Sequence, residues 1–204
     1  MNELLLKPAF RRLALCVLLL PLVRLFSLAA IDGLGPNPQE ALIRSTGEWA
    51  LRLICLTLAV TPMRVIFSWP ALARWRRMIG LLAFFYASVH LLCYAVFDMG
   101  LNLPGILVDI AKRPFILVGT LSFLLLLPLA ATSFNAAVRR LGAARWQRLH
   151  RLVYLASLTV LLHFFWMRAG KSDFSDVLVY TAVVGALLGW RLWRRFQTSR
   201  SARI

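Results

Sequence analysis

The chain has 204 residues, of which 60% are hydrophobic, and its mean hydropathy is +0.74. The apolar residues fall in long runs, and a run of about 20 such residues is long enough to cross a bilayer core of roughly 30 Å. These values exclude a soluble globular domain and indicate an integral membrane protein. The net charge of +16 does not indicate nucleic-acid binding, because the basic residues stand between the apolar runs instead of forming one basic face.

Six apolar runs, separated by charged residues, are predicted to span the membrane. The first resembles a signal peptide, but Arg24 interrupts its long core and no clear small-residue cleavage site precedes Asp32, so we interpret it as a retained span. None of the runs alternates like a barrel strand, so helices must satisfy the backbone hydrogen bonds in lipid. The predicted fold class is all-α: an integral membrane six-helix bundle in a single transmembrane domain over residues 1–204. The predicted spans are 11–30, 46–66, 78–97, 114–131, 149–167 and 176–193.

The charged residues predict the orientation of this bundle. Most lysines and arginines fall in the two tails and in the loops after the second and fourth spans, whereas every acidic residue except Glu3 falls towards the other side. By the positive-inside rule, both termini are predicted to be cytoplasmic. On the outer side, residues 103–112 are predicted to form a short amphipathic helix at the membrane interface.

Several common cofactor sites are excluded by the absence of their motifs. Cys16, Cys55 and Cys93 stand singly within apolar runs, and no CxxC or CxxCH occurs, so neither a zinc site nor covalent haem attachment is indicated. The sequence contains no GxGxxG after a strand and no P-loop, so this chain has no NAD(P)H-oxidising domain of its own. We find no convincing internal repeat.

All three histidines lie on two predicted spans: His90 on the third, and His150 and His163 on the fifth. His90 lies 13 residues beyond Arg77 and His163 lies 12 residues beyond Arg151, so each is roughly 18–20 Å above its basic edge. Two neutral imidazoles at one depth on facing helices are suited to bind a haem iron from opposite sides. His90 and His163 are therefore the candidate axial ligands of a b-type haem, with structural hydrogen bonding as the alternative.

His150 lies at the basic edge of the fifth span, about 20 Å from His163 along a helix. A second bis-histidine site would need another histidine near Arg77, and none exists there. Three interpretations stay open: His150 ligates a second haem with a different partner or none, contacts a flavin or quinone, or simply occupies the interface. Arg77, Arg148 and Arg151 are candidate partners of haem propionates or a flavin phosphate, or else positive-inside anchors.

Four long segments carry a resemblance to a known family. They are TGEWALRLICLTLAVTPMR (46–64), RRMIGLLAFFYASVHLLCY (76–94), KRPFILVGTLSFLLLLPLAATS (112–133) and RWQRLHRLVYL (145–155). In this order they closely resemble the MsrQ family, formerly YedZ, which belongs to the ferric-reductase-like transmembrane proteins. The resemblance covers nearly the whole chain.

This resemblance implies a membrane cytochrome b of the bacterial inner membrane. Such a subunit passes electrons from the quinone pool or a reduced flavin to a periplasmic molybdopterin-dependent methionine sulfoxide reductase, which repairs oxidised periplasmic proteins. The resemblance implies that His90, His150 and His163 ligate one or two haem b groups, and it associates an FMN with the subunit at no position that we can assign. Catalysis of sulfoxide reduction would then lie in the partner. Ferric reductases with two histidine pairs have a fourth histidine that is missing here.

Two other classes of function compete with this interpretation. A proton or solute transporter would use the histidines as a relay, but the carboxylates that such a relay needs all fall near the predicted outer ends of the spans. A purely structural membrane anchor for a periplasmic enzyme would need no reducible cofactor at all. A colourless purified protein would favour one of these two.

Overall fold

The computed structural model describes residues 2–170 and 173–201, and every regular element in these two ranges is helical. The predicted all-α fold class is thus confirmed. The elements are α1 (Asn2–Leu6), α2 (Pro8–Ala30), α3 (Pro38–Ile66), the 3₁₀ turn η1 (Pro70–Leu72), α4 (Ala73–Cys93), the π-helical turn η2 (Tyr94–Asp98), α5 (Leu103–Lys112), α6 (Pro114–Ala131), α7 (Asn135–Leu141), α8 (Ala143–Leu149), α9 (Leu152–Ala169) and α10 (Ser175–Ser201).

Within the described residues, six helical segments are long and apolar enough to cross a membrane, which confirms the predicted number of spans. They are Pro8–Ala30, Pro38–Ile66, Pro70–Asp98, Pro114–Ala131, Ala143–Ala169 and Ser175–Thr198. Most extend beyond the predicted ranges, because a prediction from hydropathy ends each span at a charged residue, whereas the helices continue past such residues. Prolines at the first helical position mark several true starts, and the Asn37 side chain caps α3 by accepting from the Glu40 N–H at 3.2 Å.

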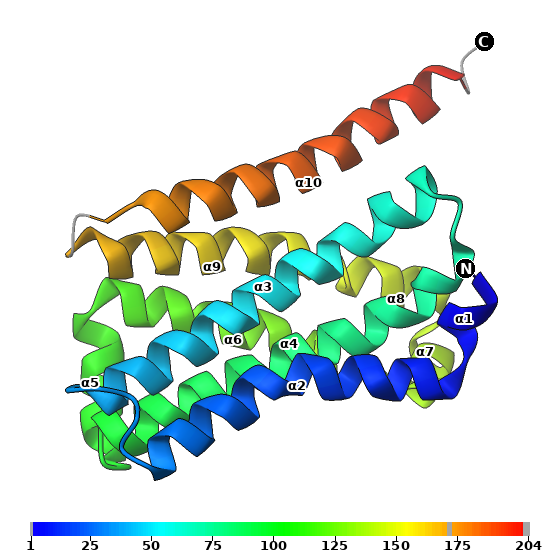
Figure 1. Ribbon diagram of the computed structural model, residues 1–204. Coiled ribbons are helices and arrows are strands. Elements are labelled where there is room, and N and C mark those ends of the chain that lie inside the picture. Colours follow the sequence, from blue (N-terminus) through cyan, green and yellow to red (C-terminus); the bar gives the residue numbers. More distant parts are fainter. Residues whose placement is uncertain (1, 171–172, 202–204) are drawn as a thin grey trace.

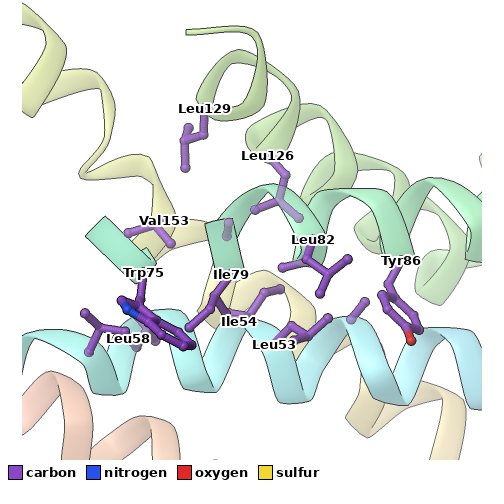
Figure 2. Packing of buried hydrophobic residues seen from close by; sticks show 14 of the residues in the cluster. Leu53, Ile54, Leu58, Trp75, Ile79, Leu82, Tyr86, Leu126, Leu129 and Val153 are labelled. Carbon is purple, nitrogen blue, oxygen red and sulfur yellow. The ribbon is translucent and has the colours of Figure 1, made fainter. Parts of the chain in front are cut away.

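Two helix pairs form the centre of the bundle: α3 packs along α4, and α6 packs along α9. Their buried apolar side chains meet in one core, part of which is drawn in Figure 2. Apolar side chains elsewhere, such as Leu20 and Val23 on α2, point outward and are well exposed, as expected for a surface that faces lipid. The labelled core residues in Figure 2 are Leu53, Ile54 and Leu58 of α3, Trp75, Ile79, Leu82 and Tyr86 of α4, Leu126 and Leu129 of α6, and Val153 of α9.

Prolines interrupt two spans, and neighbouring helices donate hydrogen bonds to backbone carbonyls at or beside these breaks. Pro62 has no N–H to donate to the Leu58 carbonyl, and the Arg191 guanidinium of α10 donates to that oxygen instead. Pro21 interrupts α2 as well, and the Tyr86 hydroxyl of α4 donates at 2.8 Å to the Leu18 carbonyl, which is next to the Val17 carbonyl that the proline leaves without a helical donor. These contacts hold α10 and α2 against the central pairs where lipid offers no hydrogen-bond partner.

The two ends of the bundle differ in charge, and we refer to them as the basic end and the acidic end. The basic end holds α1, α7, α8 and the end of α10, so both described ends of the chain lie there (the right side of Figure 1). The acidic end holds α5, the end of α9 and the start of α10. The predicted amphipathic helix at 103–112 is present as α5, with Leu103 and Leu107 exposed and Asp109 buried against the Tyr94 hydroxyl and Arg113.

Candidate functional site

His90 and His163 meet between the two central helix pairs. His90 projects from α4 and His163 from α9, and their ring centroids lie 6.2 Å apart with the ring planes at 73°. More than seventy residues separate the two histidines in the sequence, so the fold, and not local structure, brings them together. The two imidazoles are thus brought together at one depth in the bundle.

Each of the two imidazoles is oriented by a backbone carbonyl of a facing helix. Nδ1 of His90 lies 2.8 Å from the Ile43 carbonyl oxygen of α3, and Nδ1 of His163 lies 2.6 Å from the Phe115 carbonyl oxygen of α6. A carbonyl oxygen only accepts, so Nδ1 carries the proton and donates in both cases. The Nε2 atom of each neutral ring therefore keeps its lone pair, as in a histidine prepared to bind a metal.

A glycine of the same facing helix underlies each ring. A Cβ atom built on Gly47 of α3 would lie 3.0 Å from Nδ1 and Cε1 of His90, and one built on Gly119 of α6 would lie 2.8 Å from the same atoms of His163. Each glycine follows the accepting carbonyl by four residues, which is one helical turn. The two halves of the site thus repeat the same local arrangement of carbonyl, glycine and histidine.

The chemistry of this donor set fits a haem better than a metal ion bound by side chains alone. Within residues 2–170 and 173–201, no cluster of three or more His, Cys, Asp or Glu side chains could hold a metal ion. An imidazole nitrogen lies about 2 Å from a metal, and the ring centre about 1 Å farther, so two imidazoles on opposite faces of one ion have centroids roughly 6 Å apart. The observed 6.2 Å matches that spacing. Two axial imidazoles suffice only when a macrocycle supplies the remaining ligands.

His150 lies away from this pair, in the turn that joins α8 to α9 at the basic end. Its ring stacks on Trp146, with centroids 3.9 Å apart and planes at 28°. Its Nε2 lies 3.2 Å from the Thr132 hydroxyl, which itself donates to the Pro128 carbonyl at 2.6 Å. The hydroxyl proton is therefore used, so the His150 Nε2–H donates to Thr132 Oγ1, and Nδ1 keeps the lone pair.

A cavity of about 250 Å³ adjoins His150. Its walls come from α3, α4, α6, α8 and α9, so it lies between the two central helix pairs on the basic side of His90 and His163. An aromatic ring, hydroxyl groups and guanidinium groups surround an otherwise apolar space, which suits a flat ligand with an anionic group. The polar and aromatic lining residues are Thr57, Thr61, Arg64, Arg76, Arg77, Phe84, Ser133, Trp146 and His150.

The three predicted arginines do not share one position. Arg77 lines the cavity and donates to the Asn135 side chain at 2.7 Å. Arg148 and Arg151 are exposed and do not line it. Arg64 and Arg76, which the sequence analysis did not single out, line the cavity together with Arg77.

A charged cluster that sequence reasoning missed lies at the acidic end. Arg168 of α9 is only 2% exposed and lies 2.8 Å from an Asp176 carboxylate oxygen, 3.3 Å from Asp173 and 3.6 Å from Glu48. Hydrogen bonds from the Ser175 hydroxyl and N–H, and then the charge of Arg168, lower the pKa of the Asp173 carboxyl. This cluster ties α9 to α3 and α10 near the histidine pair.

The chain matches the family "Ferric reductase like transmembrane component" over residues 46–162. It is also 59% identical to the "Protein-methionine-sulfoxide reductase heme-binding subunit MsrQ" of Polaromonas naphthalenivorans (strain CJ2), over 96% of this chain and 90% of that protein. This chain belongs to the MsrQ family. The MsrQ proteins of Ralstonia nicotianae (strain ATCC BAA-1114 / GMI1000) and Xanthomonas campestris pv. campestris (strain 8004) are 50% and 45% identical over 91% and 83% of this chain, and over 86% and 77% of their own lengths. No solved structure matches the chain.

Membership of the MsrQ family agrees with the resemblance drawn from four sequence segments. The range that matches the ferric reductase family contains His90 and His150 and ends one residue before His163. Sequence reasoning missed Gly47 and Gly119, although each precedes its histidine by nearly the same interval, 43 and 44 residues. This repeated interval between glycine and histidine is a feature of the sequence from which the two glycines could have been predicted.

Proposed function

We propose that this chain is the haem-binding membrane subunit of a methionine sulfoxide reductase system and transfers electrons to its catalytic partner. The relatives that it matches are named as heme-binding subunits of protein-methionine-sulfoxide reductase. The observation that carries the proposal is the pair formed by His90 and His163, 6.2 Å apart, with both Nδ1 atoms donating to backbone carbonyls. His90 and His163 would be the axial ligands of one haem b.

A bound haem would supply reversible one-electron chemistry, and the chain's own residues would position it and exclude water. The carbonyls of Ile43 and Phe115 would hold the two imidazoles in the tautomer that offers Nε2. Sulfoxide reduction would lie in the partner, a periplasmic molybdopterin-dependent enzyme, and this chain would contribute no catalytic residue to it.

The cavity at the basic end is the proposed site of electron uptake. His150 and Arg77 lie on its wall, and Arg64 and Arg76 add positive charge for an anionic group. A reduced flavin such as FMN, a quinol of the respiratory pool, or a second haem with His150 as its ligand would each satisfy part of this lining. The Thr132 contact occupies Nε2 of His150, so a haem at this site would have to be ligated through Nδ1 or displace this contact. Arg148 and Arg151, which are exposed, would act as positive-inside anchors at the membrane surface.

The proposed location is the bacterial inner membrane, with the basic end in the cytoplasm. The arginines of the tails and of the loops at this end support cytoplasmic termini by the positive-inside rule. Electrons would enter through the basic end and leave the His90–His163 site at the acidic end, towards the periplasmic partner.

A dithionite-reduced minus oxidised spectrum of the purified protein, with haem quantified against protein, tests the proposal. We expect sharp low-spin b-type bands at one haem per chain, lost in His90→Ala and in His163→Ala and largely retained in His150→Ala. Unchanged spectra in all three variants would contradict the ligand assignment. Purified protein without haem, from cells able to make it, would contradict the proposed function and favour a transporter or a structural anchor.

A further inference from the structure

The two histidines of the pair rest on glycines in the same way. His90 packs on Gly47 and His163 on Gly119, and the carbonyl that accepts from each Nδ1 lies one turn earlier on the helix that carries the glycine. We propose that Gly47 and Gly119 are positioning residues that set the orientation of the two imidazoles, and through it their basicity as ligands. As far as it concerns haem, this inference rests on the proposed function.

Any side chain at these glycines would displace the imidazole. A Cβ atom on Gly119 would lie 2.8 Å from Nδ1 and Cε1 and 3.3 Å from Nε2 of His163, and one on Gly47 would lie 3.0 Å from Nδ1 and Cε1 of His90. These separations are well inside the usual contact of about 3.5–4.0 Å between non-bonded heavy atoms. Neither ring can retreat freely, because its Nδ1–H donates to a carbonyl of the helix on which it rests.

In each half of the site, the carbonyl and the glycine therefore act together to hold the imidazole in place. Moving an imidazole away from its glycine lengthens the Nδ1–H···O=C hydrogen bond, at 2.8 Å for His90 and 2.6 Å for His163. That bond raises the basicity of a metal-binding imidazole and fixes its ring plane. Loss of the glycine should therefore weaken the ligand, rotate its plane and favour the reduced state of the iron.

Other glycines in the spans provide matched controls. A Cβ atom on Gly185 or Gly189 of α10 would meet nothing within 4 Å. Replacing either by alanine adds the same methyl group to a helix and should be neutral or slightly stabilising, because alanine is the better helix former. Any effect confined to Gly47 and Gly119 then arises from the histidines.

The first experiment compares Gly47→Ala, Gly119→Ala, Gly185→Ala and Gly189→Ala holoprotein. We expect the first two to bind haem roughly ten-fold more weakly, to shift the electron paramagnetic resonance g-values of the ferric form, and to raise its midpoint potential. Gly119→Ala should have the larger effect, because its contact is shorter. The two α10 variants should match the parent. Unaltered g-values and midpoint potential in both Gly47→Ala and Gly119→Ala would overturn the inference while the haem assignment stands.

A double-mutant cycle tests the same contacts with thermal unfolding as its readout instead of a haem signal. Gly119→Ala should lower the midpoint temperature of thermal unfolding in the parent but not in His163→Ala, and Gly47→Ala should behave likewise with His90→Ala. Equal losses in both backgrounds would overturn the inference. Coupling in the cycle together with a protein that takes up no haem would support the packing role and contradict the proposed function, so the two failures are distinguishable.

Discussion

The histidine pair and the single histidine use opposite nitrogens for their hydrogen bonds. His90 and His163 donate from Nδ1 to backbone carbonyls, whereas His150 donates from Nε2 to the Thr132 hydroxyl. The pair sits between tightly packed helices on two glycines, while His150 lies in a turn beside a cavity of about 250 Å³. The same residue type is thus fixed by backbone carbonyls in one region and left beside an arginine-lined cavity in the other.

Under the proposed function, this difference separates two tasks: holding a cofactor and admitting an electron donor. A site that holds a cofactor permanently benefits from backbone partners, which side-chain motion does not disturb. A site that meets an exchanging donor needs space, charge and an aromatic surface, which the cavity around His150 and Trp146 offers. Substitutions near the acidic end should therefore mainly lower stability, and substitutions around the cavity should mainly change the rate of reduction.

The largest stability effect is expected at Arg168. Its guanidinium is buried among Glu48, Asp173 and Asp176, so Arg168→Leu would remove the cation that pairs with both aspartates, while Glu48 would keep its pairs with Arg44 and Arg52. We expect the free energy of unfolding to fall by about 3 kcal/mol, near the lower limit for breaking a buried pair because the carboxylates are partly exposed. Thermal unfolding in detergent measures this loss. Arg151→Leu, at an exposed arginine of the basic end, is the control, and an equal loss there would refute the contrast.

A smaller effect is expected at Arg191 of α10, which donates to a carbonyl of α3. Arg191→Met removes the donor to the Leu58 carbonyl that Pro62 leaves without a helical partner. We expect a loss of about 1–2 kcal/mol, the cost of one unsatisfied buried carbonyl. In a Pro62→Ala background the helix itself supplies an N–H, so the same substitution should cost much less. Undiminished destabilisation in that background would show that Arg191 acts by another contact.

Arg76 and Arg77 should affect electron uptake more than stability. Replacing both by glutamine removes two positive charges from the cavity wall. We expect reduction by an anionic donor, measured with reduced FMN by stopped-flow absorbance, to slow roughly ten-fold at low salt, and the salt dependence to weaken. Arg148→Gln with Arg151→Gln is the matched control, since both are exposed outside the cavity. Equal slowing in the control would assign the effect to surface charge instead of the cavity.

Much of the fold followed from the sequence because lipid imposes simple constraints. Hydropathy gave the six spans, and the amphipathic pattern at 103–112 matched the bounds of α5. Equal depth selected His90 and His163 from three histidines, since helical rise converts residue number into height. These arguments use only distance along one helix, which sequence determines well.

The rest depends on which helices become neighbours, and sequence periodicity does not contain that information. Gly47 and Gly119 acquire meaning only because α3 faces α4 and α6 faces α9. The turn at His150 contains no proline or glycine, so the sequence does not predict this turn. It therefore does not predict that Arg148 and Arg151 lie outside the cavity. Arg168 resembles an ordinary interfacial anchor until Glu48, from a distant helix, is placed beside it.

The smallest expected effect is the pH dependence of the acidic-end cluster, measured by comparing the parent with Asp173→Asn. The folded-state pKa of Asp173 is lowered by Ser175 and then by Arg168, so its carboxylate stabilises the fold above its unfolded pKa of about 3.9. That contribution is lost as the pH falls through the lower folded-state pKa. Below this pKa, Asp173 of the parent is protonated and neutral, as the asparagine of the variant is at every pH. The difference in unfolding temperature between the two proteins should stay constant from about pH 8 to pH 5 and shrink as the pH falls below the unfolded pKa. The difference for Arg191→Met should not change over this range, because a guanidinium does not titrate there. A difference for Asp173→Asn that persisted at the lowest pH would mean that geometry, and not charge, holds this end of the bundle together.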